Sequence, residues 1–268
     1  MKRVSLFAGC LLSLGAATTS PVIAAAAAHA PASLSVDQIV ERNVAARGGL
    51  AAWRAAKTLT IAGEMDAGGK PNHVLPFVLK EKRPRKSRLE IVFKDQTSVQ
   101  VYDGAQGWKV RPFLNRNDVE TYTPAEMKSA AAEQDLDGPL VDYAAKGTQI
   151  ALAGTEPVEG HPAYKLKLTL RNGDKRMLWI DAASFLELKI DGEPRKLDAK
   201  MHNVAVYFRD YKTEHGLTTP RLQETAIEGV KQTYKMTISR VAVNEPLDDA
   251  LFQKPQFAAL ATPGPKKP

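Results

Sequence analysis

The residue types that most often catalyse reactions or bind metals occur in this sequence without a functional spacing. The chain has no Gly-x-Ser-x-Gly turn to expose a nucleophilic serine and no glycine-rich loop to hold a phosphate. No metal-ligand spacing is formed by its five histidines, His29, His73, His161, His202 and His215. The sequence therefore predicts no catalytic residue, no metal site and no cofactor, and we do not expect an enzyme.

A repeated apolar pattern is the strongest chemical signal, because it could bury either a core or a ligand. Residues 162–190, PAYKLKLTLRNGDKRMLWIDAASFLELKI, alternate apolar and polar side chains and are interrupted once, at Asn172-Gly173. Asn-Gly between two alternating runs is typical of a β-hairpin with a two-residue turn. Such a turn would place Arg171 opposite Asp174 and bring five apolar side chains onto one face: Tyr164, Leu166, Leu168, Met177 and Trp179.

Strands that could extend this face lie on both sides of the hairpin. Five segments between residues 57 and 113 alternate with a period of two, and turn residues such as Asp103-Gly104 separate them. Their short connections predict sequential antiparallel neighbours with one covered face. Further alternating segments after residue 148 bring the total to about 10–11 strands. The sequence therefore predicts a mainly β, α+β protein; a simple two-sheet sandwich is the alternative, although it would not obviously need the helices described next.

Four helical segments are predicted between these strands. Ser35 and Gln38 form a capping box before an apolar pattern of helical spacing, and a second short helix follows at once. Thr123 as N-cap predicts a helix over 124–135, and a further short helix is expected over 137–146. The last two helices interrupt the strands mid-chain, where a lid over the sheet could be inserted.

The first 30 residues have the pattern of a cleaved secretory signal peptide, with Lys2 and Arg3 before an apolar run and then alanines. An uncleaved membrane anchor is the alternative. Cys10 in FAGC resembles a lipoprotein acylation site, but the apolar run continues past it, so we expect a periplasmic protein rather than a lipoprotein. We predict one domain over 31–255 and a disordered tail over 256–268.

The charge is moderately basic, with 37 Lys and Arg against 30 Asp and Glu, and it is not the clustered excess of a nucleic-acid binder. We therefore expect no nucleic acid partner. The densest basic run is KEKRPRKSR, residues 80–88. It is interpreted as a solvated strand end around Pro84, and the alternative is a docking surface for acidic lipid headgroups or an acidic partner.

The order of several short segments resembles the LolA/LolB superfamily of periplasmic lipoprotein carriers, and within it the outer-membrane lipoprotein-sorting proteins. RseB-type envelope sensors share that fold. The resemblance rests on Gly48-Gly49-Leu50 with Trp53, DLDGPLVDY at 135–143, the long segment 147–168, LWID at 178–181, FRDY at 208–211, LTTP at 217–220 and VAVNEPLDDALFQKP at 241–255.

This resemblance implies a strongly curved antiparallel sheet, an unclosed β-barrel whose mouth is plugged by helices and whose cavity holds acyl chains. It implies a ligand-binding inner face formed by Leu89, Ile91, Trp108, Leu166, Leu168, Met177, Trp179, Met236 and Ile238. The implied lid carries Met127, Leu140, Val141 and Tyr143. The mid-chain helices contain no arginine that could act as the lid tether of the carriers.

The implied function is a periplasmic carrier or binder of a lipidic ligand, either lipoprotein acyl chains or another lipid, in a monomeric protein. Acyl chains bind by burial of CH₂ groups and need no catalytic residue. The alternative is an envelope regulatory or scaffold module, in which the same fold binds another envelope protein and its cavity is collapsed. For every apolar residue named above, ordinary core packing is the competing interpretation.

Overall fold

The computed structural model describes residues 34–68, 73–133 and 136–256, and the structural statements below refer to these residues. They contain the helices α1 (Val36–Ala46), α2 (Leu50–Ala55) and α3 (Pro124–Glu133), and the 3-10 helices η1 (Pro112–Leu114) and η2 (Asp249–Phe252). None of the described helices is long and apolar enough to cross a membrane. The expected signal peptide with Cys10, and the expected tail beyond its first residue, lie outside the described residues.

Strands make up most of the secondary structure. They are β1 (Thr58–Asp66), β2 (Val74–Lys82), β3 (Lys86–Phe93), β4 (Gln96–Tyr102), β5 (Gly107–Arg111), β6 (Arg116–Thr121), β7 (Gln149–Val158), β8 (His161–Thr169), β9 (Lys175–Asp181), β10 (Glu187–Asp191), β11 (Arg195–Leu197), β12 (Lys200–His202), β13 (Val204–Arg209), β14 (Lys212–Glu214), β15 (Leu217–Thr219), β16 (Leu222–Ile227) and β17 (Tyr234–Val243).

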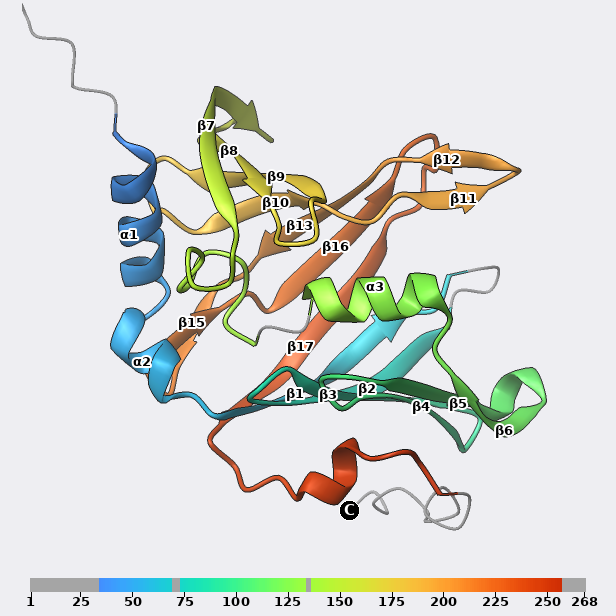
Figure 1. Ribbon diagram of the computed structural model, residues 1–268. Helices are drawn as coiled ribbons and strands as arrows, with labels where there is room; N and C mark the ends of the chain where they lie inside the picture. Colours follow the sequence, from blue (N-terminus) through green and yellow to red (C-terminus); the bar gives the residue numbers. More distant parts are fainter. Residues whose placement is uncertain (1–33, 69–72, 134–135, 257–268) are drawn as a thin grey trace, which may run out of the picture. The chain divides into compact units, whose positions relative to one another are not determined.

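One curved antiparallel sheet of 13 strands dominates the fold, in the order β6-β5-β4-β3-β2-β1-β17-β16-β13-β10-β9-β8-β7 (Figure 1). Its edge strands β6 and β7 do not pair with each other, so the sheet does not close into a barrel. The hairpins β11–β12 and β14–β15 form separate small sheets. The predicted mainly β fold with an unclosed antiparallel barrel is confirmed, although its large sheet alone has more strands than the expected 10–11.

The face of the large sheet that carries the main hydrophobic cluster is called the inner face. The helices α1 and α2 contribute Ile39 and Trp53 to this cluster, and the segment 136–147 contributes Leu140 and Val141. The strands contribute Leu59, Phe77, Leu166, Leu168, Leu178, Ile180, Ile238 and Val241. Covering helices and segments therefore share one core with the sheet, as the alternation of the strands predicts.

Two smaller clusters lie on the opposite, outer face. Trp108 packs with Val99 and Val101 against Phe252 of η2, so the C-terminal segment covers the outer face of β4 and β5. A second cluster joins Trp179 to Val158 and Ala163. The registers fix these sides, because the residues preceding Val101 and Trp179 in the sequence pair with inner residues.

The helix starts follow the predicted capping chemistry. In α1 the Ser35 Oγ accepts from the Gln38 amide at 3.2 Å, and the Gln38 side chain accepts from the Ser35 amide at 2.9 Å. The expected helix over 137–146 is wrong, because residues 136–147 form a series of turns. Gly138 and Asp142 have φ values of +76° and +51° there, which a right-handed helix cannot accommodate.

The hairpin at residues 162–190 exists, but its predicted register is wrong by one residue. Leu170 donates to the Asp174 carbonyl oxygen, so the loop holds three residues, and Gly173 occupies the left-handed region with φ +85°. The slip pairs Leu166 with Leu178 instead of Trp179. Because the side-chain period of a strand is two, it moves Met177 and Trp179 to the outer face.

Candidate functional site

Six apolar side chains on neighbouring strands of the inner face remain partly exposed, and we call them the apolar patch. Pairing places Ile61 beside Leu79, and Leu79 beside Leu89, while Met65 pairs with Met236. The complete patch consists of Ile61, Met65, Leu79, Leu89, Ile91 and Met236. It extends over β17, β1, β2 and β3, which are consecutive in the sheet.

Helix α3 is tied to strands near both edges of the open sheet. Near one edge, the Lys109 Nζ on β5 contacts the two carboxylate oxygens of Glu126 at 2.5 and 2.7 Å. Two residues further along α3, the Lys128 Nζ contacts Asp174 in the β8–β9 loop, near the other edge, at 2.8 Å. Since Gln100 pairs with both Leu89 and Lys109, Lys109 belongs to the inner face. The N-terminal half of α3 therefore lies between the two edge regions of the open sheet (Figure 1).

The two tethers differ in their exposure to solvent. The Lys109 side chain is 8% exposed, whereas that of Lys128 is 61% exposed. Burial raises the pKa of Glu126, but hydrogen bonds from Lys109 and Thr123 lower it more, so this pKa lies below its ordinary value. The hydrogen bond from Lys128 lowers the pKa of Asp174. Both carboxylates are therefore charged near neutral pH, and both tethers are intact.

Helix α3 contains few long apolar side chains. Its sequence is PAEMKSAAAE, in which Met127 is the single long apolar residue. Met127 is partly buried, and Ala130 is 7% exposed. None of the described side chains of α3 belongs to the inner hydrophobic cluster, so the apolar patch keeps accessible area on the inner face.

The other half of the inner face is closed. Leu166, Leu168 and Ile180 have no exposed surface, because Leu140 and Val141 of the segment 136–147 cover them together with α1. The predicted lid residues Leu140 and Val141 are thus core residues. Tyr143 packs beside them and donates its hydroxyl to Asp37 on α1 at 2.9 Å.

The predicted ligand residues are therefore divided between three places. Leu89, Ile91 and Met236 belong to the apolar patch, and Ile238 is buried beside it. Leu166 and Leu168 share the inner face but lie in its closed half. The assignment of Trp108, Met177 and Trp179 to the inner face is wrong, because they belong to the two outer clusters.

Several residues of the site were not predicted. Leu79 continues the same period-two pattern as its neighbours and could have been found from it. The Lys109–Glu126 and Lys128–Asp174 pairs join residues 17 and 46 positions apart, and no local pattern signals them. Ion pairs of this kind depend on the curvature of the whole sheet.

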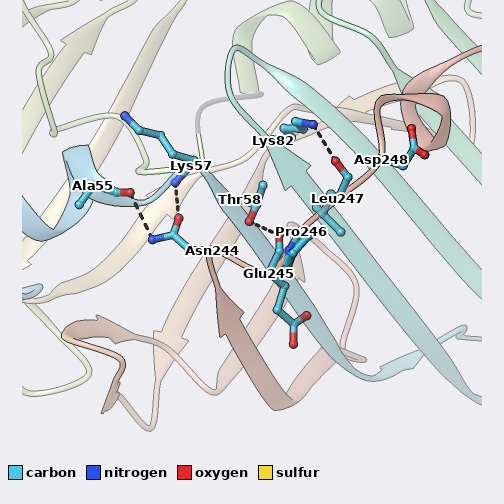
Figure 2. Close-up of a pocket in the computed structure, with 9 residues that line it drawn as sticks. All are labelled: Ala55, Lys57, Thr58, Lys82, Asn244, Glu245, Pro246, Leu247 and Asp248. Atoms are coloured by element: carbon cyan, nitrogen blue, oxygen red, sulfur yellow. Dashed lines mark hydrogen bonds between the residues drawn. The ribbon is translucent and has the colours of Figure 1, made fainter.

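A separate open groove of about 680 Å³ lies on the outer face, where the C-terminal segment leaves β17 (Figure 2). Figure 2 shows that Asn244 bridges the segment to the start of β1, accepting from the Lys57 amide at 2.7 Å and donating to the Ala55 carbonyl. Thr58 and Lys82 donate to carbonyl oxygens of Glu245 and Leu247. The polar groups that line the groove attach the segment to the sheet.

Metal and acid–base chemistry has little support in the described part of the chain. Among these residues, no group of three His, Cys, Asp or Glu side chains could hold a metal ion. His161 lies 3.6 Å from Asp181 at the start of β8, and His202 contacts the Glu228 carbonyl oxygen. Burial raises the pKa of Asp181, but hydrogen bonds from Ser184 and Ala183 lower it more, which suits a carboxylate that fixes a turn.

Comparisons with known proteins agree with this architecture. No protein-family model matches the sequence, and no curated protein matches it. Solved structures do match. An outer membrane lipoprotein-sorting protein domain from Vibrio parahaemolyticus has 14% identity and a TM-score of 0.54 over 81% of this chain and 95% of its own. A LolA superfamily protein from Nitrosomonas europaea has 14% identity and a TM-score of 0.54 over 82% and 98% of the two chains.

The chain has a LolA-like fold. A DUF1329 family protein from Desulfovibrio piger matches with 17% identity and a TM-score of 0.57, over 84% of this chain and 98% of its own. All three structures are covered almost completely, so the likeness extends over nearly the whole of each of them. At these identities the likeness concerns the fold and not the ligand.

Proposed function

We propose that this protein is a periplasmic carrier or binder of a lipidic ligand, whose acyl chains occupy the apolar patch beneath α3. It is not an enzyme in this proposal. The observation that carries it is the partly exposed row of apolar side chains on β17, β1, β2 and β3, together with the small side chains of the tethered helix α3. Each CH₂ group of an acyl chain buried there would contribute ~0.8 kcal/mol.

Entry of the ligand requires α3 to move, and the two tethers suggest which contact breaks first. The Lys128–Asp174 pair is the more exposed of the two, and surface ion pairs of this kind contribute only ~0.2–1 kcal/mol. The Lys109–Glu126 pair is held by a nearly buried lysine. Helix α3 would therefore release the β8–β9 loop first and pivot on β5.

The cargo is lipoprotein acyl chains or another lipid. The match to an outer membrane lipoprotein-sorting domain supports an envelope location and an acylated ligand. The fold supports this class of ligand only by analogy, and the patch itself supports an acyl chain of either origin. A monomer suffices for this proposal, because one chain supplies both the patch and its cover.

A fluorescent fatty acid, 11-(dansylamino)undecanoic acid, tests the proposal by titration into the purified protein. The Ile91→Asp variant places a charge in the patch and should weaken binding at least about tenfold. The matched control is Val92→Asp, because Val92 is the next residue on β3, faces outward and is 37% exposed. Equal loss in both variants, or no binding to the wild type, would refute the proposal.

A filling variant separates loss of binding from loss of folding. Leu89→Trp adds apolar volume to the patch without adding charge, so it should occupy part of the ligand space and weaken binding. Circular dichroism would establish that the variant is folded. Unchanged affinity in a folded Leu89→Trp protein would mean that the acyl chain lies elsewhere.

The alternative function is an envelope regulatory module that binds another protein. The closed half of the inner face favours it, because there α1 and the segment 136–147 bury the apolar side chains of the sheet, as in a fold whose cavity has collapsed. The same titration distinguishes the two functions. A sensor of this kind would bind no acyl probe and would respond to neither Ile91→Asp nor Leu89→Trp.

A further inference from the structure

A second pocket, of about 330 Å³, lies where β2 turns into β3. Its walls come from two parts of the chain, residues 81–86 and residues 136–146. It shares only Lys82 with the outer groove. We call it the basic pocket, because five of its lining residues are cations: Lys82, Arg83, Arg85, Lys86 and Lys146.

The carboxylates in the depth of the basic pocket already have cationic partners. Asp137 is almost fully buried and accepts hydrogen bonds from Arg83 at 2.6 Å and Lys146 at 2.5 Å. Asp142 accepts two hydrogen bonds from Arg54, at 2.6 and 3.0 Å. The buried Asp137 carboxylate requires such partners, and the partly exposed Asp142 is paired with Arg54. Because Asp137 and Asp142 are already paired, they have little capacity to neutralise the cations at the rim of the pocket.

The rim of the basic pocket carries an excess of positive charge. Lys82 and Lys86 direct their ammonium groups to the outer face, where both contact Asp249, at 3.1 and 2.8 Å, and Lys82 also donates to the Leu247 carbonyl oxygen. Arg85 is exposed and has no ion-pair partner in the described part of the chain. An anionic group at the rim would therefore find the guanidinium of Arg85, with Arg83 and Lys146 close by in the same pocket.

The basic pocket adjoins the apolar patch. Leu79 of the patch and Glu81 of the pocket are successive inner-face residues of β2, which places their Cα atoms ~6.8 Å apart. Leu136 both lines the pocket and packs against the inner cluster. An apolar surface that leads directly into a basic rim matches an amphiphile with an anionic head.

We infer that the basic pocket binds the phosphate-bearing headgroup of an amphiphile whose acyl chains lie on the apolar patch. The inference rests on the proposed function and narrows its ligand to a phospholipid class. Arg85 supplies a guanidinium to the phosphate oxygens, and Arg83 and Lys146 add positive charge within the pocket. The carboxylates of Asp137 and Asp142, deeper in the pocket, repel the phosphate, so it lies at the rim and not on the floor of the pocket.

Isothermal titration with two soluble lipids of equal chain length tests the inference. Dihexanoyl phosphatidylglycerol carries the phosphate, and dihexanoylglycerol lacks it. The wild type should bind the phospholipid at least about tenfold more tightly, since charge-assisted hydrogen bonds are the strong ones. Equal affinities would overturn the headgroup site while leaving the apolar patch supported. Binding of neither lipid would overturn the proposed function as well.

A charge-reversal pair locates the effect. Arg85→Glu should weaken phosphatidylglycerol binding about fivefold or more and leave dihexanoylglycerol binding unchanged. The matched control is Arg195→Glu, which makes the same charge change on the exposed β11–β12 hairpin. Equal weakening in both variants would show a general charge effect and overturn the site.

Inorganic phosphate identifies the source of the recognised group. In the presence of an equimolar concentration of inorganic phosphate, the affinity for phosphatidylglycerol should stay the same, because the free ion lacks the acyl chains. Competition as strong as that of the lipid would overturn the inference in favour of a site for free phosphate.

Discussion

The two halves of the inner face are built on the same sheet and are covered differently. Near β8 and β9, Leu166, Leu168 and Ile180 are completely buried, because the segment 136–147 and α1 supply long apolar side chains. Over β17, β1, β2 and β3, none of the described side chains of α3 joins the hydrophobic cluster, and the apolar patch stays partly exposed.

The chemistry of the cover therefore decides what each half can do. Where the cover carries leucine, valine and isoleucine, the sheet and cover complete one packed core and no ligand is needed. Where the cover carries small side chains and is held by two ion pairs, the apolar surface remains available. Four predictions follow from this contrast between closed and open halves, with the largest effect first.

Stability should differ most between the halves. Leu168→Ala removes an enclosed side chain and should lower the free energy of unfolding by ~3–5 kcal/mol, because a cavity remains in the closed half. Leu79→Ala in the apolar patch should lower it by ~1 kcal/mol or less, since the side chain is already partly exposed. Urea unfolding of both variants measures the difference, and equal losses would mean that the patch is packed as tightly as the core.

The tethers of α3 should differ in strength. Lys109→Met should reduce the amide exchange protection of residues 124–133 by about fivefold, because it removes the nearly buried partner of Glu126. Asp174→Asn should reduce it less than about twofold, since the Lys128 side chain is mostly exposed. Hydrogen exchange followed by mass spectrometry tests which of the two variants loses more protection in α3. A larger effect from Asp174→Asn would make the Lys128–Asp174 pair the stronger tether of α3.

Acidification should loosen the open half before the closed half. The pKa values of Asp174 and Glu126 lie below their ordinary values of 3.8 and 4.5, so the tethers contribute fully above about pH 4.5 and are lost as the pH falls through the lowered values. Exchange protection of α3 should be constant from pH 7 to 5 and should fall below about pH 4. A loss of exchange protection between pH 7 and 6 would mean that a titrating group other than Glu126 or Asp174 holds α3.

The outer face should be irrelevant to ligand binding. Trp179 donates to Glu156 at 2.6 Å and packs beneath Lys189, and both contacts lie outside the apolar patch. Trp179→Phe should therefore change the affinity for an acyl probe by less than about twofold. A larger change, measured by the same titration as for Ile91→Asp, would return Trp179 to the binding surface.

Local patterns predicted much of this fold. The capping boxes at Ser35 and Thr123 place the starts of α1 and α3, because both motifs are complete within four residues. The strands from β1 to β5 follow from period-two alternation, and the resemblance to the LolA group supplied the unclosed barrel. These features depend on neighbours in sequence or on the order of segments.

The candidate site was predicted less well, for two physical reasons. Asn172-Gly173 predicts a hairpin but does not distinguish a two-residue loop from a three-residue one, and one residue of slip sends Met177 and Trp179 to the opposite face. Trp108 could not be assigned from its strand alone, because Phe252, far away in the sequence, covers it on the outer face. The sides of a sheet that is apolar on both faces are decided by such remote contacts.

The most direct test of the central claim is native mass spectrometry of the protein purified from the periplasm without detergent. The account predicts an acyl-bearing ligand bound to the wild type and to Val92→Asp at equal occupancy, and absent from a folded Ile91→Asp variant. A ligand-free wild type, or a ligand retained equally by Ile91→Asp, would contradict the claim that the apolar patch holds acyl chains.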